Sequence, residues 1–126
     1  MPADNKILTS MTKEEFLQAF TNINGALILK FGAEWCGPCK KIEGLVKELM
    51  EQTPESVKCA VIDIDEDFEL YGLFKSKRLI NGVPAIFAFK RGNVSGRPDN
   101  VVVGADENQI RTFFQYYIDL LPGQKS

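Results

Sequence analysis

Histidine is missing from this sequence of 126 residues. Its absence removes the usual acid–base side chain of the neutral pH range, the commonest metal ligand of proteins and any cysteine–histidine nucleophile pair. Cysteine is scarce as well, because three residues are too few, and odd in number, for the disulfide framework of a small secreted protein. Any chemistry of these cysteines must be redox or metal chemistry that proceeds without imidazole.

Long apolar runs and a strong charge of either sign are also absent. No run approaches the roughly 20 residues that cross a bilayer, and residues 1–6 lack the basic and then apolar order of a secretory signal. The net charge is -2, so no basic field attracts nucleic acid or an anionic membrane. We therefore expect a soluble, cytoplasmic chain whose partners are proteins or small molecules. Its length and 44% hydrophobic content predict a single domain, residues 1–126.

The apolar pattern predicts strands that alternate with helices, followed by a strand hairpin. Apolar residues at helical spacing predict four helices: 12–20, 38–50, 70–74 and 106–121, the last ended by Pro122-Gly123. Continuous apolar runs predict four strands, with a short edge strand as a fifth candidate: 26–31, 57–64, 84–89, 101–103 and 6–9. This order predicts an α/β fold with a central mixed sheet of four to five strands and about four flanking helices.

Two cysteines, Cys36 and Cys39, lie three positions apart between a predicted buried strand and a predicted helix. This spacing puts both on the first helical turn, near enough for their sulfurs to bond. The free N–H groups and the positive dipole end of a helix start stabilise a thiolate at Cys36, which is therefore predicted to attack disulfides. Cys39, one turn inside, is predicted to resolve the mixed disulfide that forms. Pro38 suits a helix start because its missing N–H has no partner there.

The segment 33–40, Ala-Glu-Trp-Cys-Gly-Pro-Cys-Lys, resembles the redox motif of the thioredoxin family, and the resemblance extends over most of the chain. It implies the thioredoxin fold and a thiol–disulfide oxidoreductase that reduces disulfides in protein substrates. It also implies that an external electron donor, similar to thioredoxin reductase, restores the dithiol. No bound cofactor and no metal are expected.

The resemblance further implies a substrate surface beside the dithiol. Gly82-Val83-Pro84 is similar to the family segment in which a cis proline faces the two cysteines, and Gly104 matches a glycine near the end of the hairpin. An extended substrate segment is then expected to pair with the backbone at Val83, as in strand addition. The implied substrate-binding residues are Trp35, Gly37, Pro38, Gly82, Val83, Pro84 and Gly104.

The sequence departs from the family pattern at Lys30, where the resemblance leads us to expect a buried aspartate that manages the proton of the second cysteine. One interpretation is that Lys30 covers core with its methylenes and extends its amine to water. The other is that Lys30 approaches the cysteines and, when charged, favours their thiolates, which makes it a modulator of their pKa. A second departure is Gly44, which matches a proline that kinks the motif helix in many relatives.

Two other functions stay open at this point. The first is a binding module that holds a partner on the same surface, with redox activity secondary or lost. The second is a metal or iron–sulfur protein, although zinc normally takes four ligands and the chain offers only Cys59 beyond the pair. Cys59 itself is predicted to be a small core residue of a buried strand. The acidic run 63–67 is interpreted as a solvated strand exit.

Overall fold

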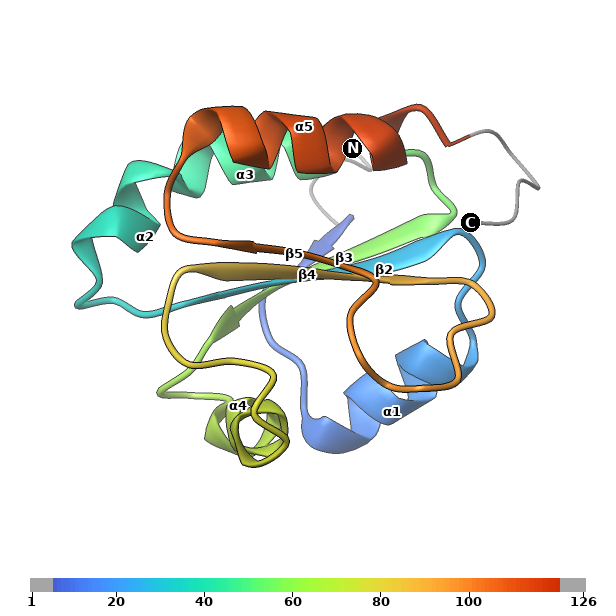
Figure 1. Ribbon diagram of the computed structural model, residues 1–126, viewed down its shortest axis with the longest axis horizontal. Coiled ribbons are helices and arrows are strands. Elements are labelled where there is room, and N and C mark those ends of the chain that lie inside the picture. The colour runs from blue at the N-terminus through green and yellow to red at the C-terminus, as the bar shows by residue number, and fades with distance from the viewer. Residues whose placement is uncertain (1–5, 121–126) are drawn as a thin grey trace.

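The computed structural model describes residues 6–120, in which strands and helices alternate along the chain (Figure 1). The strands are β1 (Ile7–Leu8), β2 (Ala26–Gly32), β3 (Val57–Asp63), β4 (Ala85–Lys90) and β5 (Asn100–Val103). The helices are α1 (Lys13–Thr21), α2 (Gly37–Lys41), α3 (Glu43–Gln52), α4 (Phe68–Ser76) and α5 (Glu107–Ile118). None of the described helices is long and apolar enough to cross a membrane.

The five strands form one mixed sheet in the order β1-β3-β2-β4-β5. β1, β3 and β2 run parallel, whereas β4 and β5 are each antiparallel to their neighbours. The predicted mixed sheet and its edge strand are therefore confirmed. Because β2 and β3 are parallel, the loops that follow them emerge at the same edge of the sheet. That edge carries the cysteine motif.

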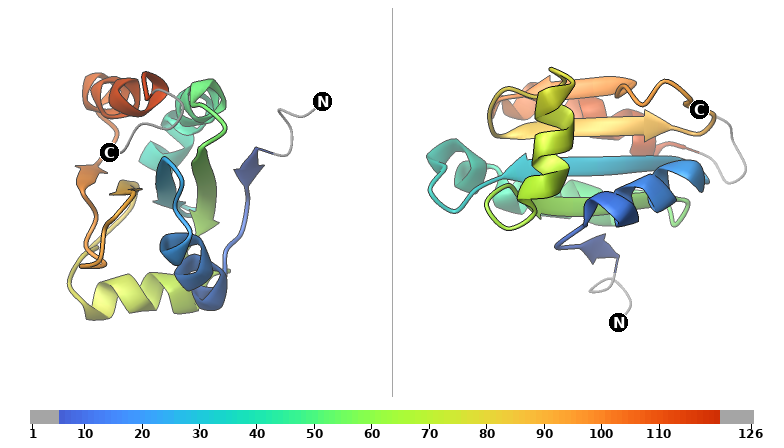
Figure 2. Two further views of the ribbon diagram at one scale, coloured as in Figure 1. Left: turned by 90° about the vertical axis from the view of Figure 1, so that its right-hand side faces the viewer. Right: turned by 90° about the horizontal axis from the view of Figure 1, so that it is seen from below.

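Helices cover both faces of the sheet (Figures 1 and 2). α1 and α4 lie on one face, and α2, α3 and α5 lie on the other. Successive residues of β2 point to opposite faces, so Leu27, Leu29 and Phe31 join the core beneath α1 and α4. Ala26 and Ile28 join the second core, beneath α3 and α5. The same alternation directs Lys30 to the face of α2 and α3.

The predicted helix 38–50 is two helices, so the prediction of one continuous helix was wrong. The break falls at Ile42, whose φ of -102° and ψ of 3° leave the helical range. Gly44, which matches the kink proline of many relatives, is the second residue of α3. A break of one residue leaves Ile42, Val46 and Leu49 on the same buried face. The apolar period therefore continues across it, and a pattern search cannot detect it.

The helix ends differ from prediction in two further places. α4 continues to Ser76, and Ile80 in the predicted polar connection is buried. α5 ends at Ile118, and buried Leu120 follows it; the predicted stop at Pro122-Gly123 and the core residue Leu121 lie outside the described residues. Capping side chains marked the starts of α1 and α5 in the sequence, whereas the start of α3 was not predicted and α4 begins two residues before the predicted Leu70. Thr12 and Glu15 form the expected capping box.

Candidate active site

Cys36 and Cys39 form a disulfide at the edge of the sheet where β2 ends. Their Cα atoms are 5.3 Å apart, as the three-residue spacing predicted. Cys36 is the N-cap of α2, with Pro38 in the first turn, and its Sγ accepts a hydrogen bond of 3.1 Å from the Cys39 N–H. A donor directed at this sulfur favours negative charge on it once the disulfide is reduced. Both cysteines are nearly buried, at 5% and 3% exposed.

The segment before β4 faces the dithiol. The Val83–Pro84 bond is cis, and the Val83 carbonyl oxygen lies 3.8 Å from Cys36 Sγ. Gly104, just after β5, donates its N–H to the Pro84 carbonyl at 2.9 Å. Its φ of 99° lies in the left-handed region, which favours glycine. The fold thus brings Val83, Pro84 and Gly104, which are distant in the sequence, to one side of Cys36.

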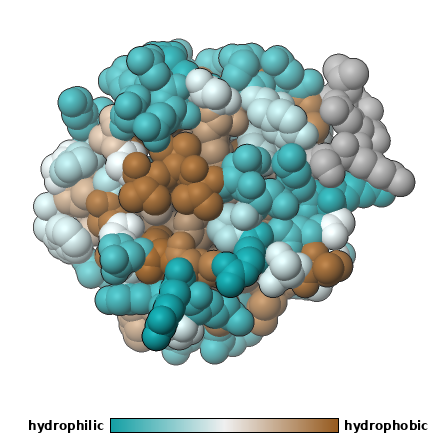
Figure 3. Space-filling view, viewed as in Figure 1, coloured by the Kyte–Doolittle hydropathy of each residue, from teal (hydrophilic) through white to brown (hydrophobic). Residues whose placement is uncertain are grey.

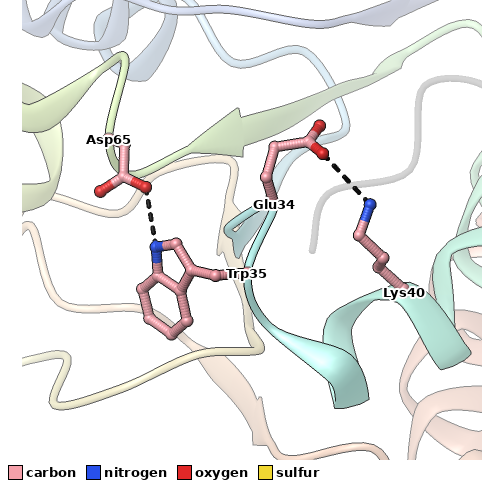
Figure 4. A network of polar contacts seen from close by, with 4 residues as sticks. All are labelled: Glu34, Trp35, Lys40 and Asp65. Atoms are coloured by element: carbon pink, nitrogen blue, oxygen red, sulfur yellow. Dashed lines mark hydrogen bonds and ion pairs between the residues drawn. The ribbon is translucent and has the colours of Figure 1, made fainter.

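Trp35 is a surface residue, with 68% of it exposed. Its indole Nε1–H donates to Asp65 Oδ2 at 2.8 Å, which connects the ring to the segment that follows β3 (Figure 4). A separate ion pair of 3.2 Å joins Glu34 to Lys40 across the start of α2. Trp35 is therefore available for contact with another molecule, as an amphipathic aromatic at a site edge commonly is.

Asp65 is a site residue that the sequence reasoning missed, because the acidic run 63–67 was interpreted only as a solvated strand exit. The signal was present in the topology. β2 and β3 were both predicted strands of one sheet, and loops that follow neighbouring parallel strands meet at one edge. A carboxylate just after β3 is therefore well placed to reach a tryptophan just after β2.

An apolar strip continues from the Gly104 end of the site along the edge strand β5. Val101 and Val103 are 47% and 67% exposed, and both lie on this strand. Figure 3 shows a brown patch at the middle of the viewed face, where β5 runs in Figure 1. Exposed apolar surface next to a reactive site suits contact with protein segments.

Lys30 is buried, with 4% of it exposed, so it does not extend into bulk water as one interpretation expected. Its side chain lines a cavity of about 160 Å³, which Cys39 and Glu43 also line. Burial lowers the pKa of Lys30, and the nearby Glu43 carboxylate partly opposes this by favouring the ammonium form. The fold thus places a lysine with a perturbed pKa on the same cavity as the second cysteine.

Cys59 is fully buried in β3, as predicted. Its Sγ lies 3.7 Å from Thr53 Oγ1, and burial raises the pKa of its thiol. It is not part of the dithiol site. Among residues 6–120, no group of three or more acidic, cysteine or histidine side chains could hold a metal ion.

The site has relatives among known proteins. The sequence model of the thioredoxin family matches residues 7–116 of this chain. The chain belongs to the thioredoxin family. With its cysteine pair at bonding distance, it is a thiol–disulfide oxidoreductase of that family. The predicted resemblance, fold class and reaction type are thereby confirmed.

Individual thioredoxins match over most of this chain. Thioredoxin O1, mitochondrial, of Arabidopsis thaliana is 33% identical over 117 residues, which cover 89% of this chain and 56% of that protein. A thioredoxin of Pyropia yezoensis is 26% identical, over 88% of this chain and 97% of its own length. The crystal structure of Arabidopsis thioredoxin O1 in its oxidized state superimposes with a TM-score of 0.73 at 29% identity, over 91% of this chain and all of that one.

The Trp35–Asp65 hydrogen bond leads to a prediction about substrate reduction. Asp65→Ala leaves the indole without its acceptor, and we expect kcat/KM for a protein disulfide to fall about two- to fivefold, in line with a net hydrogen bond of about 1 kcal/mol. Trp35 is the only tryptophan, so its fluorescence reports the change directly. Glu34→Ala, which removes the neighbouring carboxylate, is the control and should leave the emission spectrum unchanged. An unaltered spectrum in Asp65→Ala contradicts the orienting role.

Proposed function

We propose that this thioredoxin-family protein reduces disulfides in protein substrates, with Cys36 as the nucleophile and Cys39 as the resolving cysteine. The amide hydrogen bond to Cys36 Sγ supports this assignment, because it favours the thiolate at Cys36 rather than at Cys39. Cys36 attacks the substrate disulfide and forms a mixed disulfide, which releases the first substrate thiolate. Cys39 then attacks Cys36 Sγ, forms the internal disulfide and releases the second thiolate.

The substrate surface of this proposal surrounds Cys36. The backbone of Val83 pairs with an extended substrate segment and brings the target disulfide within reach of Cys36 Sγ, 3.8 Å from the Val83 oxygen. The exposed indole of Trp35 forms one side of this surface. The other proposed contacts are Gly37 and Pro38 at the start of α2, Gly82 and Pro84 beside Val83, and Gly104 after β5.

A trapping experiment tests the two roles. In Cys39→Ser the resolving thiol is missing, so we expect the protein to react once with a disulfide substrate and to remain attached to it through Cys36. Intact mass spectrometry measures the adduct, and peptide mapping identifies the modified cysteine. Cys36→Ser in the same reaction should form little adduct. Attachment through Cys39 in the latter variant, at the rate seen for Cys36, contradicts the proposal.

The proposal also covers the electron donor, the substrates and the cellular compartment of the reaction. A reductase similar to thioredoxin reductase supplies the electrons, disulfide-containing proteins are the substrates, and residues 1–126 act as a single domain in the cytoplasm. The buried free thiol of Cys59 is consistent with a reducing compartment. Imaging of the tagged chain tests the location, with mitochondria as the alternative because the Arabidopsis relative carries that word in its name.

A further inference from the structure

Lys30 and Cys39 face one another across Gly32. A Cβ atom on Gly32 would lie 3.4 Å from Cys39 Sγ and 3.6 Å from Lys30 Nζ. The sulfur and the amine are therefore no farther apart than those two distances combined. Because glycine has no side chain, the space between them stays open. The proposed reaction requires Cys39 to lose a proton before it attacks, so the group across this gap matters.

The gap belongs to the cavity of about 160 Å³ that Lys30, Cys39 and Glu43 line. A water molecule needs roughly 10–15 Å³ of such space and at least two polar partners. The cavity meets both needs, with an amine on one wall and a thiol on another. A proton can therefore pass between Cys39 Sγ and Lys30 Nζ through water, without direct contact between the two atoms.

The charged groups around Lys30 determine whether it can carry an added proton. No described residue forms a hydrogen bond or an ion pair with Lys30 Nζ in the structure. The charged side chains that line this cavity and the adjoining one are Glu34 before α2, Lys40 on α2, Glu43, Lys47 and Glu51 on α3, and Asp63 at the end of β3. Lys40 is paired with Glu34. The carboxylates of Glu43, Glu51 and Asp63 have no ion-pair partner among the described residues, and the charge of Glu43 favours the ammonium form of Lys30.

Resting on the proposed function, we propose that Lys30 accepts the proton of Cys39 in the resolving step. The neutral amine of Lys30 takes the thiol proton through water and becomes an ammonium, while Cys39 becomes a thiolate. The thiolate attacks Cys36 Sγ, the new bond joins the two cysteines, and the bond between Cys36 and the substrate sulfur breaks. The substrate leaves as a thiolate. Solvent then takes the proton from the ammonium of Lys30, which restores the neutral amine.

The burial of Lys30 fits this role. A lysine in water holds its proton far too tightly to act as a base near neutral pH. Burial lowers the pKa of Lys30, so more of its amine is neutral than in a lysine exposed to water, and a neutral amine can accept a proton. Glu43 acts in the opposite direction and stabilises the ammonium after the transfer. The amine can therefore accept the proton and later lose it.

Stopped-flow mixing of the reduced protein with one equivalent of dithiobis(nitrobenzoate), an aromatic disulfide that releases a coloured thiolate, separates the two steps. The first release reports attack by Cys36, and the second reports attack by Cys39 on the mixed disulfide. In Lys30→Met we expect the first phase to be retained. We expect the second to slow on the order of 10²-fold near neutral pH, within the range of general base catalysis. Its rate should then increase continuously with pH, because hydroxide replaces the amine, whereas the wild-type rate levels off.

Two further variants complete the test. Gly32→Ala keeps the amine and its charge but places a methyl group between Nζ and Sγ; its contacts of 3.4 Å and more are ordinary, so it folds, and the second phase should slow about tenfold. Lys47→Met removes a lysine that lines only the adjoining cavity, and it should leave both phases at wild-type rates.

The outcomes separate the role of Lys30 from the proposed reduction of disulfides by Cys36 and Cys39. Absence of the first phase in the wild type overturns both. A normal first phase with a wild-type second phase in Lys30→Met, at every pH, overturns the role of Lys30 alone. Where Lys30→Met does not fold, as judged by circular dichroism, Gly32→Ala decides, and an unchanged second phase in that variant overturns the role.

Discussion

Cys36→Ser is expected to abolish disulfide reduction, with turnover at the rate measured without protein. A serine hydroxyl does not form a mixed disulfide, and no histidine is present to activate it. Cys39 does not compensate, because it lies inside α2, whereas Cys36 is the N-cap residue whose sulfur accepts the Cys39 N–H. Reduction of a protein disulfide, with dithiothreitol as the electron source, measures the effect as an initial rate.

The control for Cys36→Ser is Cys59→Ala, which removes the remaining cysteine outside the dithiol. Cys59 is buried in β3, and we expect its replacement to keep the rate close to wild type. Binding of the same protein substrate, measured by calorimetry, separates the two functions left open by the sequence. Negligible turnover in the wild type, together with binding that survives Cys36→Ser, indicates a binding module and contradicts the reductase.

Phe74→Ala is expected to produce the largest loss of stability, about 3–5 kcal/mol. Phe74 is 1% exposed, and its ring centroid lies 5.0 Å from that of Phe16, 5.6 Å from Phe31 and 5.5 Å from Phe87. These rings come from α4, α1, β2 and β4, so one truncation leaves a cavity where four elements meet. Such a loss is a large part of the roughly 5–15 kcal/mol by which small domains are stable.

Urea unfolding of the oxidised protein measures this loss as a change in midpoint at constant slope. Phe68→Ala is the matched control, because it removes the same side chain from the same helix. Phe68 is 64% exposed, so its loss should change the free energy of unfolding by no more than about 0.5 kcal/mol. Equal effects of the two substitutions contradict the assignment of Phe74 to the core.

The contrast between Phe68 and Phe74 illustrates how much of the fold the local spacing of apolar residues predicts. Spacing placed Leu70 and Phe74 on the buried face of a short helix, and both are buried. The same spacing predicted the sheet, the caps of Thr12 and Asp106, and the helix that begins at the cysteine motif. It did not detect the break at Ile42, because a change in backbone direction over one residue hardly alters which side chains share a face.

Part of the candidate site could likewise be predicted from spacing in the sequence, and part could not. Cys36, Cys39 and Pro38 are neighbours in the chain, so their spacing was enough to predict a dithiol at a helix start. Val83 and Gly104 were implied only through the family resemblance, because hydrogen bonds and contacts between distant segments place them at the site. Asp65 was missed, since its role depends on a loop that follows a different strand.

Lys30 shows what the sequence determines about the site and what only the tertiary structure determines. The sequence established that a lysine stands in the strand before the dithiol, and that no histidine can take its place. It left two interpretations of that lysine, because a side chain on a strand can leave the core or stay in it. The fold selects one: the alternation of β2 directs Lys30 toward α2 and α3, and the missing side chain of Gly32 opens the path to Cys39. Burial and distance in three dimensions, which spacing along the chain does not encode, place the amine opposite the sulfur.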